Sequence, residues 1–204
     1  MHIYGITGPS GSGKSMLCAY FESMGIPHMN ADDIYHEMLV PPSPLIALLC
    51  DAFGDEIKAQ DGSIDRKALS AIVFQDPEKL TRLNTVVLDS VLQEIRQRIA
   101  ALEALGYDAV ALDAPTLIES GFHRECETVI VVLAEKEQRI LRIMERDHLS
   151  RSQAEARIHA QHEDAFYEKE AHVVLHNDQD RDALYAQASS ALFPSKDQPD
   201  RINT

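Results

Sequence analysis

The segment Gly8-Pro9-Ser10-Gly11-Ser12-Gly13-Lys14-Ser15 decides the fold of this 204-residue chain. It matches the pattern G-x-x-x-x-G-K-[ST] and lies between a strand-like run, Ile3 to Thr7, and an apolar-periodic stretch, Met16 to Met24, which predicts a helix. Glycines in such a loop let backbone N–H groups converge on phosphate oxygens, and the helix start adds unpaired donors and a positive dipole end. A chance glycine-rich turn is the alternative, and the strand–loop–helix context disfavours it. The segment predicts a nucleoside triphosphate site but not a reaction.

Most residues of the loop have an expected role. Lys14 is expected to reach the β- and γ-phosphates as a catalytic residue, and the Ser15 hydroxyl is expected to ligate Mg²⁺. ATP and Mg²⁺ are therefore the expected cofactors. The residues expected to bind ATP here are Gly8, Gly11, Ser12, Gly13, Lys14, Ser15 and Met16.

The composition excludes several other classes of protein. Acidic residues exceed basic ones by 33 to 19, which gives a net charge of −14 and disfavours a nucleic-acid partner. No apolar run approaches the roughly 18 residues that a membrane span needs, and no targeting segment is visible, so we expect a cytoplasmic protein, monomeric or a small homo-oligomer. The three cysteines are scattered, which argues against a disulfide framework. None has a histidine or a second cysteine at metal-ligand spacing, and the histidines show no metal-binding pattern.

Strand-like and helical stretches alternate along the chain. The predicted strands are Ile3–Thr7, Pro27–Met29, Ala109–Asp113, Thr128–Leu133 and His172–His176. This alternation predicts an α/β fold with three layers and a parallel sheet core. Together with the phosphate loop, it resembles the P-loop NTPase fold of nucleoside-monophosphate kinases, and that resemblance implies a helical substrate-binding insertion and a helical lid. One domain is expected over residues 1–193, with a core of 1–30, 106–140 and 163–193, a lobe of about 31–105 and a lid of about 141–162. Residues 194–204 are predicted to be a disordered tail.

Local signals mark the helices. Asp76 and Pro77 open a helix that is predicted to run to Leu105 with an interruption or kink. Ser150 and Gln153 predict a capping box. The other helices are predicted at Ala31–Leu39, Leu45–Phe53, from Asp65, and at Glu135–Arg146, Arg151–Gln161 and Asp182–Leu192.

Carboxylates follow two of the predicted strands. Ligands of open α/β sheets lie beyond the carboxyl ends of the strands, so Asp32, which follows the second strand, is the candidate general base. The alternative is that Asn30 or Asp32 only caps the next helix. Asp113 ends the third strand, where a magnesium carboxylate is expected. Glu119 either orients the acceptor or pairs with a neighbouring lysine or arginine.

Arginines gather in the predicted lid. Arg139, Arg142 and Arg146 recur at a spacing that places them on one helix face, and Arg151 and Arg157 follow. Lid arginines neutralise charge on a transferring phosphoryl group. Taken singly, each is better explained as a solvated residue paired with Glu135, Glu145 or Asp147, but as a group they favour a role at the phosphates.

Short blocks in a fixed order from about Ile3 to Asn177 resemble the dephospho-CoA kinase family. The blocks, besides Gly8 to Ser15, are Ala31-Asp32, Phe53-Gly54, Asp61-Gly62, Asp65-Arg66 with Leu69, Val73-Phe74, Leu83-Asn84, Asp113 with Pro115, Leu117 and Glu119, Arg142 to Asp147, Ala156-Arg157-Ile158, Gln161, Ala171, Val174 and Asn177. The resemblance implies transfer of the γ-phosphoryl group of ATP to the 3′-hydroxyl of dephospho-CoA, the last step of coenzyme A synthesis.

The resemblance also implies roles for single residues. Asp32 would be the base, Arg142 would face the phosphates from the lid, and Asn177 would lie near the adenine. The remaining residues implied on the substrate side are Arg66, Pro115, Leu117 and Glu119. The chain departs from the family pattern at Asn30, Leu88-Asp89, Thr116 and His172.

Two other functions are compatible with the phosphate loop. One is a related kinase for another small acceptor, such as a nucleoside or nucleotide, although no sequence block specific to such acceptors is present. The other is a non-catalytic ATP-binding regulator. The four departures are its only support, and the intact Lys14, Ser15 and Asp32 oppose it.

Overall fold

The computed structural model describes residues 1–193, so the predicted tail of 194–204 lies outside the described residues. The strands are β1 (His2–Thr7), β2 (His28–Asn30), β3 (Ala109–Asp113), β4 (Thr128–Leu133) and β5 (Val173–His176). The α-helices are α1 (Lys14–Ser23), α2 (Ala31–Met38), α3 (Pro44–Phe53), α4 (Arg66–Val73), α5 (Pro77–Ala104), α6 (Lys136–Asp147), α7 (Arg151–His159), α8 (Asp164–Glu168) and α9 (Arg181–Leu192). Short 3₁₀ helices are η1 (Asp55–Ile57) and η2 (Phe122–Glu125).

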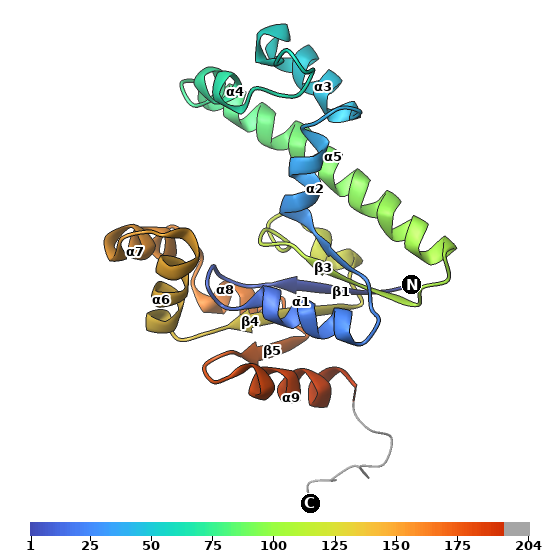
Figure 1. The fold of residues 1–204 in the computed structure, drawn as a ribbon, viewed down its shortest axis with the longest axis vertical. Helices are drawn as coiled ribbons and strands as arrows, with labels where there is room; N and C mark the ends of the chain where they lie inside the picture. The colour runs from blue at the N-terminus through green and yellow to red at the C-terminus, as the bar shows by residue number, and fades with distance from the viewer. Residues whose placement is uncertain (194–204) are drawn as a thin grey trace, which may run out of the picture. The chain divides into compact units, whose positions relative to one another are not determined.

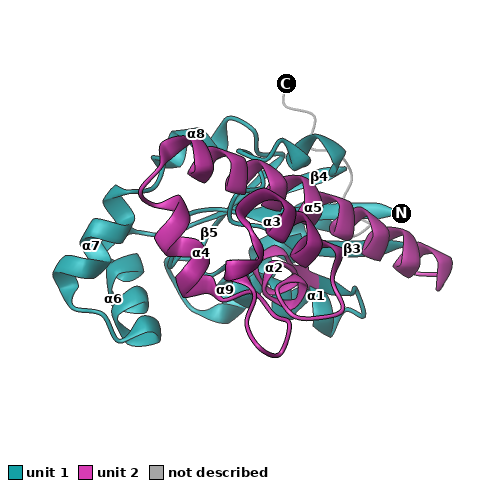
Figure 2. Cartoon of the chain, turned by 90° about the horizontal axis from the view of Figure 1, so that it is seen from above, with its two compact units in different colours: residues 1–28, 108–204 teal, residues 29–107 magenta. Residues whose placement is uncertain are grey.

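The chain divides into two compact units (Figure 2). Unit 1 comprises Met1–His28 and the chain from Asp108 onward, and unit 2 comprises Met29–Tyr107. Each unit has its own buried core, described below. In the part of the chain that the structure describes, no helix is both long and apolar enough to cross a bilayer.

A five-stranded sheet with the order β2-β3-β1-β4-β5 is the centre of the fold (Figure 1). The pairings of β1 with β3, β1 with β4, and β4 with β5 are parallel, as the near-continuous apolar runs predicted. Ile6 of β1 is in register with Asp113 of β3. The carboxyl end of β3 therefore lies next to Ile6 and Thr7, the last two residues of β1 before the glycine-rich loop.

Helices cover both faces of the sheet in unit 1, so the predicted three-layer core is confirmed. Ile130 and Val132 of β4 point to one face, where they pack with side chains of α1 and α9. Val131 and Leu133 alternate to the other face, where they pack with Ile118 and with α8. A separate small core joins α6 to α7 through Ile140, Ile143, Ala154 and Ile158.

Unit 2 is helical, and α5 packs against α2, α3 and α4. Its core is made of apolar side chains from each of these helices, including Leu45, Leu49, Leu69, Val73 and Ile95. Side chains at the N-caps start all four of these helices: Asn30 for α2, Ser43 for α3, Asp65 for α4 and Asp76 for α5.

The predicted elements are found with few exceptions. The capping box of Ser150 and Gln153 is present, and Gly25 follows α1 with a φ of 77°. The expected interruption of the long helix is wrong: α5 runs for 28 residues as one helix, because no glycine or proline follows Pro77 within it. The short helix α8 was not predicted.

Candidate active site

The glycine-rich loop joins β1 to α1 and belongs wholly to unit 1. Two of its glycines are required by close approach of other chain segments. A Cβ atom on Gly8, where φ is 134°, would lie 2.3 Å from the Val132 carbonyl oxygen, and one on Gly13, where φ is 101°, would lie 1.9 Å from Asn177 Nδ2. The loop is thus pressed against β4 on one side and against the residue after β5 on the other.

The loop ends at the N-cap of a helix, and a helix start favours anions through its unpaired N–H groups and its dipole. Gly13 is the N-cap of α1, so the backbone N–H groups that follow it directly have no hydrogen-bond acceptor within the helix. Lys14 Nζ donates to the Gly8 carbonyl oxygen at 2.8 Å and to the Pro9 carbonyl oxygen at 3.3 Å, which holds the ammonium group against the loop. Backbone donors and one cation therefore gather at one loop, as phosphate binding requires.

Arg142 and Asn177 lie where the loop turns into α1. Arg142 Nη1 donates to the carbonyl oxygens of Gly11, at 3.2 Å, and Ser12, at 3.4 Å. Its Nη2 donates to the Asn177 carbonyl oxygen at 2.9 Å, and Asn177 Nδ2 donates to the Ser12 carbonyl oxygen at 2.8 Å. The structure thus brings two predicted site residues, from α6 and from the end of β5, into direct contact with the loop.

A second arginine supports the loop from the same helix. Arg139 is only 5% exposed, and its Nε donates to the Ser10 carbonyl oxygen at 3.1 Å. Gln161 Oε1 accepts from Arg139 Nη2 at 3.2 Å and from the Ser10 backbone N–H at 3.0 Å. Asp164 lies 3.6 Å from Arg139 Nη1. The sequence included Arg139 only as one of five arginines, and its spacing did not reveal the contact with Ser10.

The remaining arginines of the predicted lid bind carboxylates. Arg151 pairs with Glu137 and Glu155, whereas Arg146 and Arg157 both pair with Asp147. The hydrogen bond from Arg146, and then the charges of Arg146 and Arg157, lower the pKa of Asp147 to about 2. These three arginines are the solvated, paired residues that the alternative interpretation predicted, although Glu137 and Glu155 take the places expected for Glu135 and Glu145.

Ser15 and Asp113 are the predicted magnesium ligands, and both belong to unit 1. Ser15 is exposed in the first turn of α1, and Asp113 is 6% exposed at the end of β3 beside the start of the loop. A hydroxyl and a carboxylate are the hard oxygen ligands that Mg²⁺ prefers, usually together with waters and phosphate oxygens. The donor set therefore fits this ion.

The segment after β3 contains the residues of unit 1 that were predicted to bind the substrate that accepts the phosphoryl group. Pro115 is half-buried, and its carbonyl oxygen accepts from Thr7 Oγ1 at 3.3 Å, which ties the segment to the end of β1. Leu117 is completely buried, so its side chain belongs to the core. Glu119 is exposed, and its Oε1 lies 3.5 Å from His162 Nε2, so it has a histidine partner rather than the lysine or arginine considered above.

Unit 2 contains the other two predicted substrate residues, Asp32 and Arg66, both exposed. The side chain of Asn30 caps α2 by accepting from the backbone N–H groups of Asp32 at 2.9 Å and Asp33 at 3.1 Å. The departure from the family pattern at Asn30 thus preserves the helix cap. Since the cap is provided by Asn30, the carboxylate of Asp32 is not needed for it.

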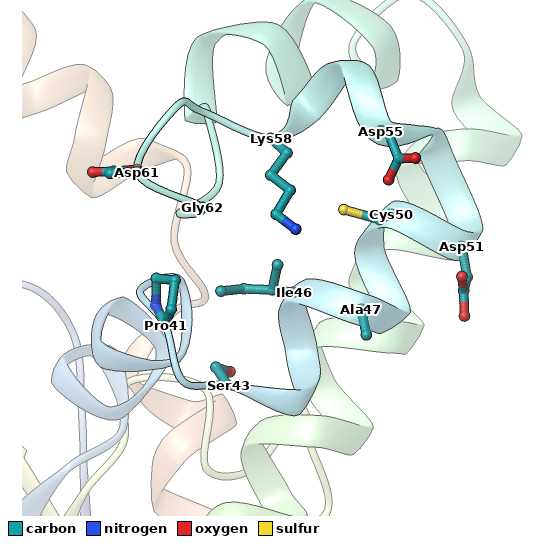
Figure 3. Close-up of a pocket in the computed structure, with 10 residues that line it drawn as sticks. All are labelled: Pro41, Ser43, Ile46, Ala47, Cys50, Asp51, Asp55, Lys58, Asp61 and Gly62. Atoms are coloured by element: carbon teal, nitrogen blue, oxygen red, sulfur yellow. The ribbon is translucent and has the colours of Figure 1, made fainter.

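An open pocket of about 620 Å³ in unit 2 is separate from these residues (Figure 3). Lys58 extends into it beside Ile46 and Cys50, and three carboxylates, those of Asp51, Asp55 and Asp61, stand around it. This excess of negative charge opposes a phosphorylated ligand. None of the predicted site residues is among those lining it.

Known proteins resemble this chain over nearly its whole length. A family model described as dephospho-CoA kinase matches residues 2–182. A dephospho-CoA kinase of Shouchella clausii is 34% identical over 188 residues, which cover 92% of this chain and 95% of that protein. One from Corynebacterium glutamicum is 35% identical over 188 residues, which cover 92% of this chain and 96% of that protein.

Solved structures share the fold of this chain. A crystal structure of a Thermus thermophilus protein has a TM-score of 0.76 at 33% identity and covers 93% of this chain and 95% of its own. A shikimate kinase of Acinetobacter baumannii, at 16% identity and a TM-score of 0.56, covers 97% of this chain and 96% of its own and shares the fold alone. On the family match and the level of identity to these relatives, the chain belongs to the dephospho-CoA kinase family.

Proposed function

We propose that this chain, a phosphotransferase of the dephospho-CoA kinase family, uses the loop of residues 8–15 to hold ATP and transfers its γ-phosphoryl group to the 3′-hydroxyl of dephospho-CoA, the last step of coenzyme A synthesis. The observation that carries the proposal is the strand–loop–helix at the start of unit 1, where backbone donors, Lys14 and Arg142 gather. Phosphoryl transfer asks mainly for positioning and for neutralisation of charge.

Lys14 and Arg142 supply the positive charge. Both side chains donate to carbonyl oxygens of the loop, and this supports their assignment to the phosphates. We assign Lys14 to the β- and γ-phosphates and Arg142 to the phosphates from α6. Asn177, which holds the Ser12 carbonyl oxygen, is assigned to the adenine side of the loop.

Ser15 and Asp113 would hold Mg²⁺. The ion would bridge phosphate oxygens and offset their negative charge. Asp113 is buried at the end of β3. The strand pairing of Ile6 with Asp113 holds its backbone beside the start of the loop. Ser15 contributes its hydroxyl from the first turn of α1.

Asp32 is assigned as the general base. It accepts the proton of the 3′-hydroxyl while the oxygen forms a bond to the γ-phosphorus, and the bond from that phosphorus to the oxygen of the leaving ADP breaks. Two observations support the assignment: the carboxylate is exposed at the start of α2, and Asn30 rather than Asp32 caps that helix. We assign Arg66, Pro115 and Glu119 to the binding of dephospho-CoA, the phosphoryl acceptor, because they match the family pattern.

The test is a coupled assay of ADP release with the purified chain, ATP and Mg²⁺. Dephospho-CoA is offered beside a panel of nucleosides and nucleotides, and mass spectrometry identifies the phosphorylated product. We expect release with dephospho-CoA only, a product heavier by one phosphoryl group, and loss of release in Lys14→Ala. Release with a nucleoside and none with dephospho-CoA would indicate a kinase for another acceptor, and no release with any acceptor would favour a non-catalytic protein.

A further inference from the structure

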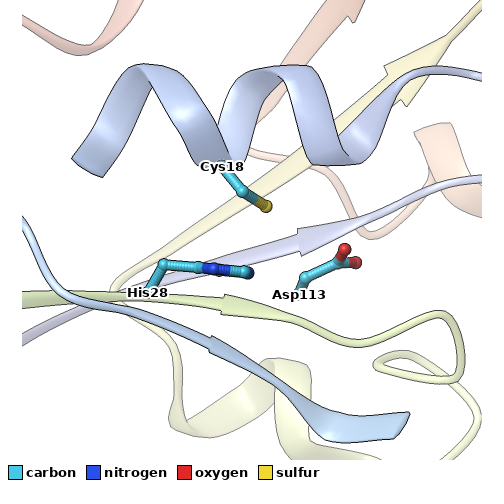
Figure 4. Close-up of side chains that lie close together, drawn as sticks. All are labelled: Cys18, His28 and Asp113. Atoms are coloured by element: carbon cyan, nitrogen blue, oxygen red, sulfur yellow. The ribbon is translucent and has the colours of Figure 1, made fainter. Parts of the chain in front are cut away.

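Three side chains with different metal-binding atoms meet inside unit 1 (Figure 4). Cys18 projects from α1, His28 from β2 and Asp113 from the end of β3, and all three point into the same space between helix and sheet. The Cys18 Sγ, a ring nitrogen of His28 and a carboxylate oxygen of Asp113 all lie within 4.8 Å of one another. Spacing along the sequence did not indicate this group, because the three residues come from three different elements and only the fold brings them together.

The set of donors fits a zinc ion. Zn²⁺ binds thiolate, imidazole and carboxylate at about 2.0–2.3 Å, and three protein ligands leave a fourth position for water. Bonds of that length place tetrahedral ligand atoms roughly 3–4 Å apart. The observed upper limit of 4.8 Å is therefore close enough for small side-chain rotations to complete the site.

The orientation of the histidine ring supports the same conclusion. His28 Nδ1 lies 3.4 Å from Glu22 Oε1 on α1. Its Nε2 is buried and has no hydrogen-bond partner among the described residues. A proton on Nδ1, facing Glu22, leaves the lone pair on Nε2 as the ring's metal-binding atom. This is the arrangement of carboxylate, histidine and metal that orients ligands in zinc sites.

We propose that Cys18, His28 and Asp113 form a binding site for Zn²⁺ or a similar thiol-binding divalent cation, with Glu22 as the positioning residue for His28. The thiolate distinguishes this site from the predicted magnesium site, whose ligands Ser15 and Asp113 offer oxygen only. Mg²⁺ binds oxygen ligands and keeps several waters, so it is not expected to use Cys18. The two sites share Asp113.

The test uses the full chain freed of metal with a chelator, and Co²⁺ as the spectroscopic probe for Zn²⁺. We expect one equivalent of Co²⁺ to produce a thiolate-to-cobalt charge-transfer band, and Zn²⁺ to abolish it. Cys18→Ala should remove the band. The matched control is Cys126→Ala, because Cys126 is also buried but lies outside the cluster, and its band should equal that of the unmodified chain.

Glu22→Gln provides a second variant that keeps the core intact, since the Glu22 side chain is 60% exposed. Loss of an outer-shell carboxylate weakens metal binding by roughly 10–100-fold, and we expect a decrease of that size here. Three results would overturn the proposal: no thiolate band at one equivalent, a band that survives Cys18→Ala, or unchanged Co²⁺ affinity in Glu22→Gln.

One consequence rests on the proposed kinase function. Because Zn²⁺ bound to Asp113 would compete with Mg²⁺ for the same carboxylate, one equivalent of Zn²⁺ should suppress ADP release in the unmodified chain but not in Cys18→Ala. The cobalt spectrum uses no substrate, so failure of the metal site and failure of the kinase function are distinguishable. A chain that shows the cobalt band yet keeps full activity with Zn²⁺ would contradict the sharing of Asp113, and not the metal site.

Discussion

Gly13 is one of the residues at which the shape of the phosphate loop is closely constrained. Its φ of 101° belongs to the region that favours glycine, and the side of the residue that would carry a Cβ is filled by Asn177. Gly25 has a similar φ of 77°, but nothing in the described structure lies within 4 Å of a Cβ placed there. Substitutions at Gly13 and Gly25 therefore distinguish two effects: both introduce backbone strain, but only the one at Gly13 also introduces a steric clash.

We expect Gly13→Ala to weaken ATP binding by more than about tenfold, the equivalent of ~1.4 kcal/mol, because the new methyl group displaces Asn177 and the loop. Gly25→Ala should cost only the strain of a left-handed residue, about 1–2 kcal/mol of stability, and leave ATP binding unchanged. Calorimetric titration with ATP, beside urea unfolding, measures both effects. Equal ATP affinity in the two variants would contradict the close contact of Gly13 with Asn177.

Asp32 carries the proposed proton transfer. Asp32→Asn keeps the size of the side chain and the hydrogen bond from the Asp32 backbone N–H to Asn30, so α2 should remain intact. We expect kcat to fall by roughly 10²–10⁴, the range for a positioned base, with ATP affinity nearly unchanged. The neighbouring exposed carboxylate offers the control Asp33→Asn, which should retain activity. Unchanged turnover in Asp32→Asn would exclude this residue as the base.

At the scale of elements, α6 is joined to the loop by Arg139 and Arg142. Arg139 differs in its surroundings from Arg151, the arginine at the start of the next helix. Arg139 is buried and holds Ser10, while Arg151 at the start of α7 is exposed and pairs only with glutamates. Hydrogen bonds from a buried charged group contribute more to stability than exposed ion pairs, which are screened by water.

We expect Arg139→Ala to lower the free energy of unfolding by about 1.5–3 kcal/mol and to weaken ATP binding, because Ser10 and Gln161 lose their shared partner. Arg151→Ala should leave both quantities nearly unchanged. Urea unfolding and ATP titration of the two variants provide the comparison. If the two arginine variants were indistinguishable, α6 would not support the loop.

Most elements were predictable from sequence because their signals are local. A few consecutive residues are enough to predict each of these features: the loop of residues 8–15, the strands β3 and β4 from their apolar runs, and the helix starts at Asp76 and Ser150. The helix α8 has only five residues, too few for a helical period to be recognised. The predicted interruption of α5 was wrong because a break needs a proline, a glycine or an inserted side chain, and the helix interior offers no glycine or proline.

The site was predictable only in part, for a related reason. The loop and Asp113 follow strands, and the rule that ligands gather at strand ends locates them. The hydrogen bond of Arg139 to Ser10 and the proximity of Cys18 to His28 and Asp113 bring together segments from different elements. They depend on the order of strands in the sheet and on the angle at which each helix crosses it, which no local pattern encodes.

At the scale of the whole molecule, the division into two units suggests a division of labour. Unit 1 contains the phosphate loop, and unit 2 contains Asp32 and Arg66. We expect ATP with Mg²⁺ to slow amide hydrogen exchange mainly in residues 8–15 and their neighbours in unit 1. Dephospho-CoA alone should slow exchange within residues 29–107, because the helical lobe is proposed to bind it. Protection of unit 1 alone by dephospho-CoA would contradict the assignment of this lobe to the acceptor.

The account depends above all on whether backbone N–H groups and Lys14 enclose a triphosphate at the start of α1. A crystal structure with a non-hydrolysable ATP analogue and Mg²⁺ tests this directly. We expect phosphate oxygens within about 2.7–3.2 Å of N–H groups in residues 11–15, with Lys14 Nζ moved from the Gly8 carbonyl oxygen to the phosphates. An analogue bound elsewhere, with Lys14 still on Gly8 and the loop empty, would contradict the proposed kinase mechanism.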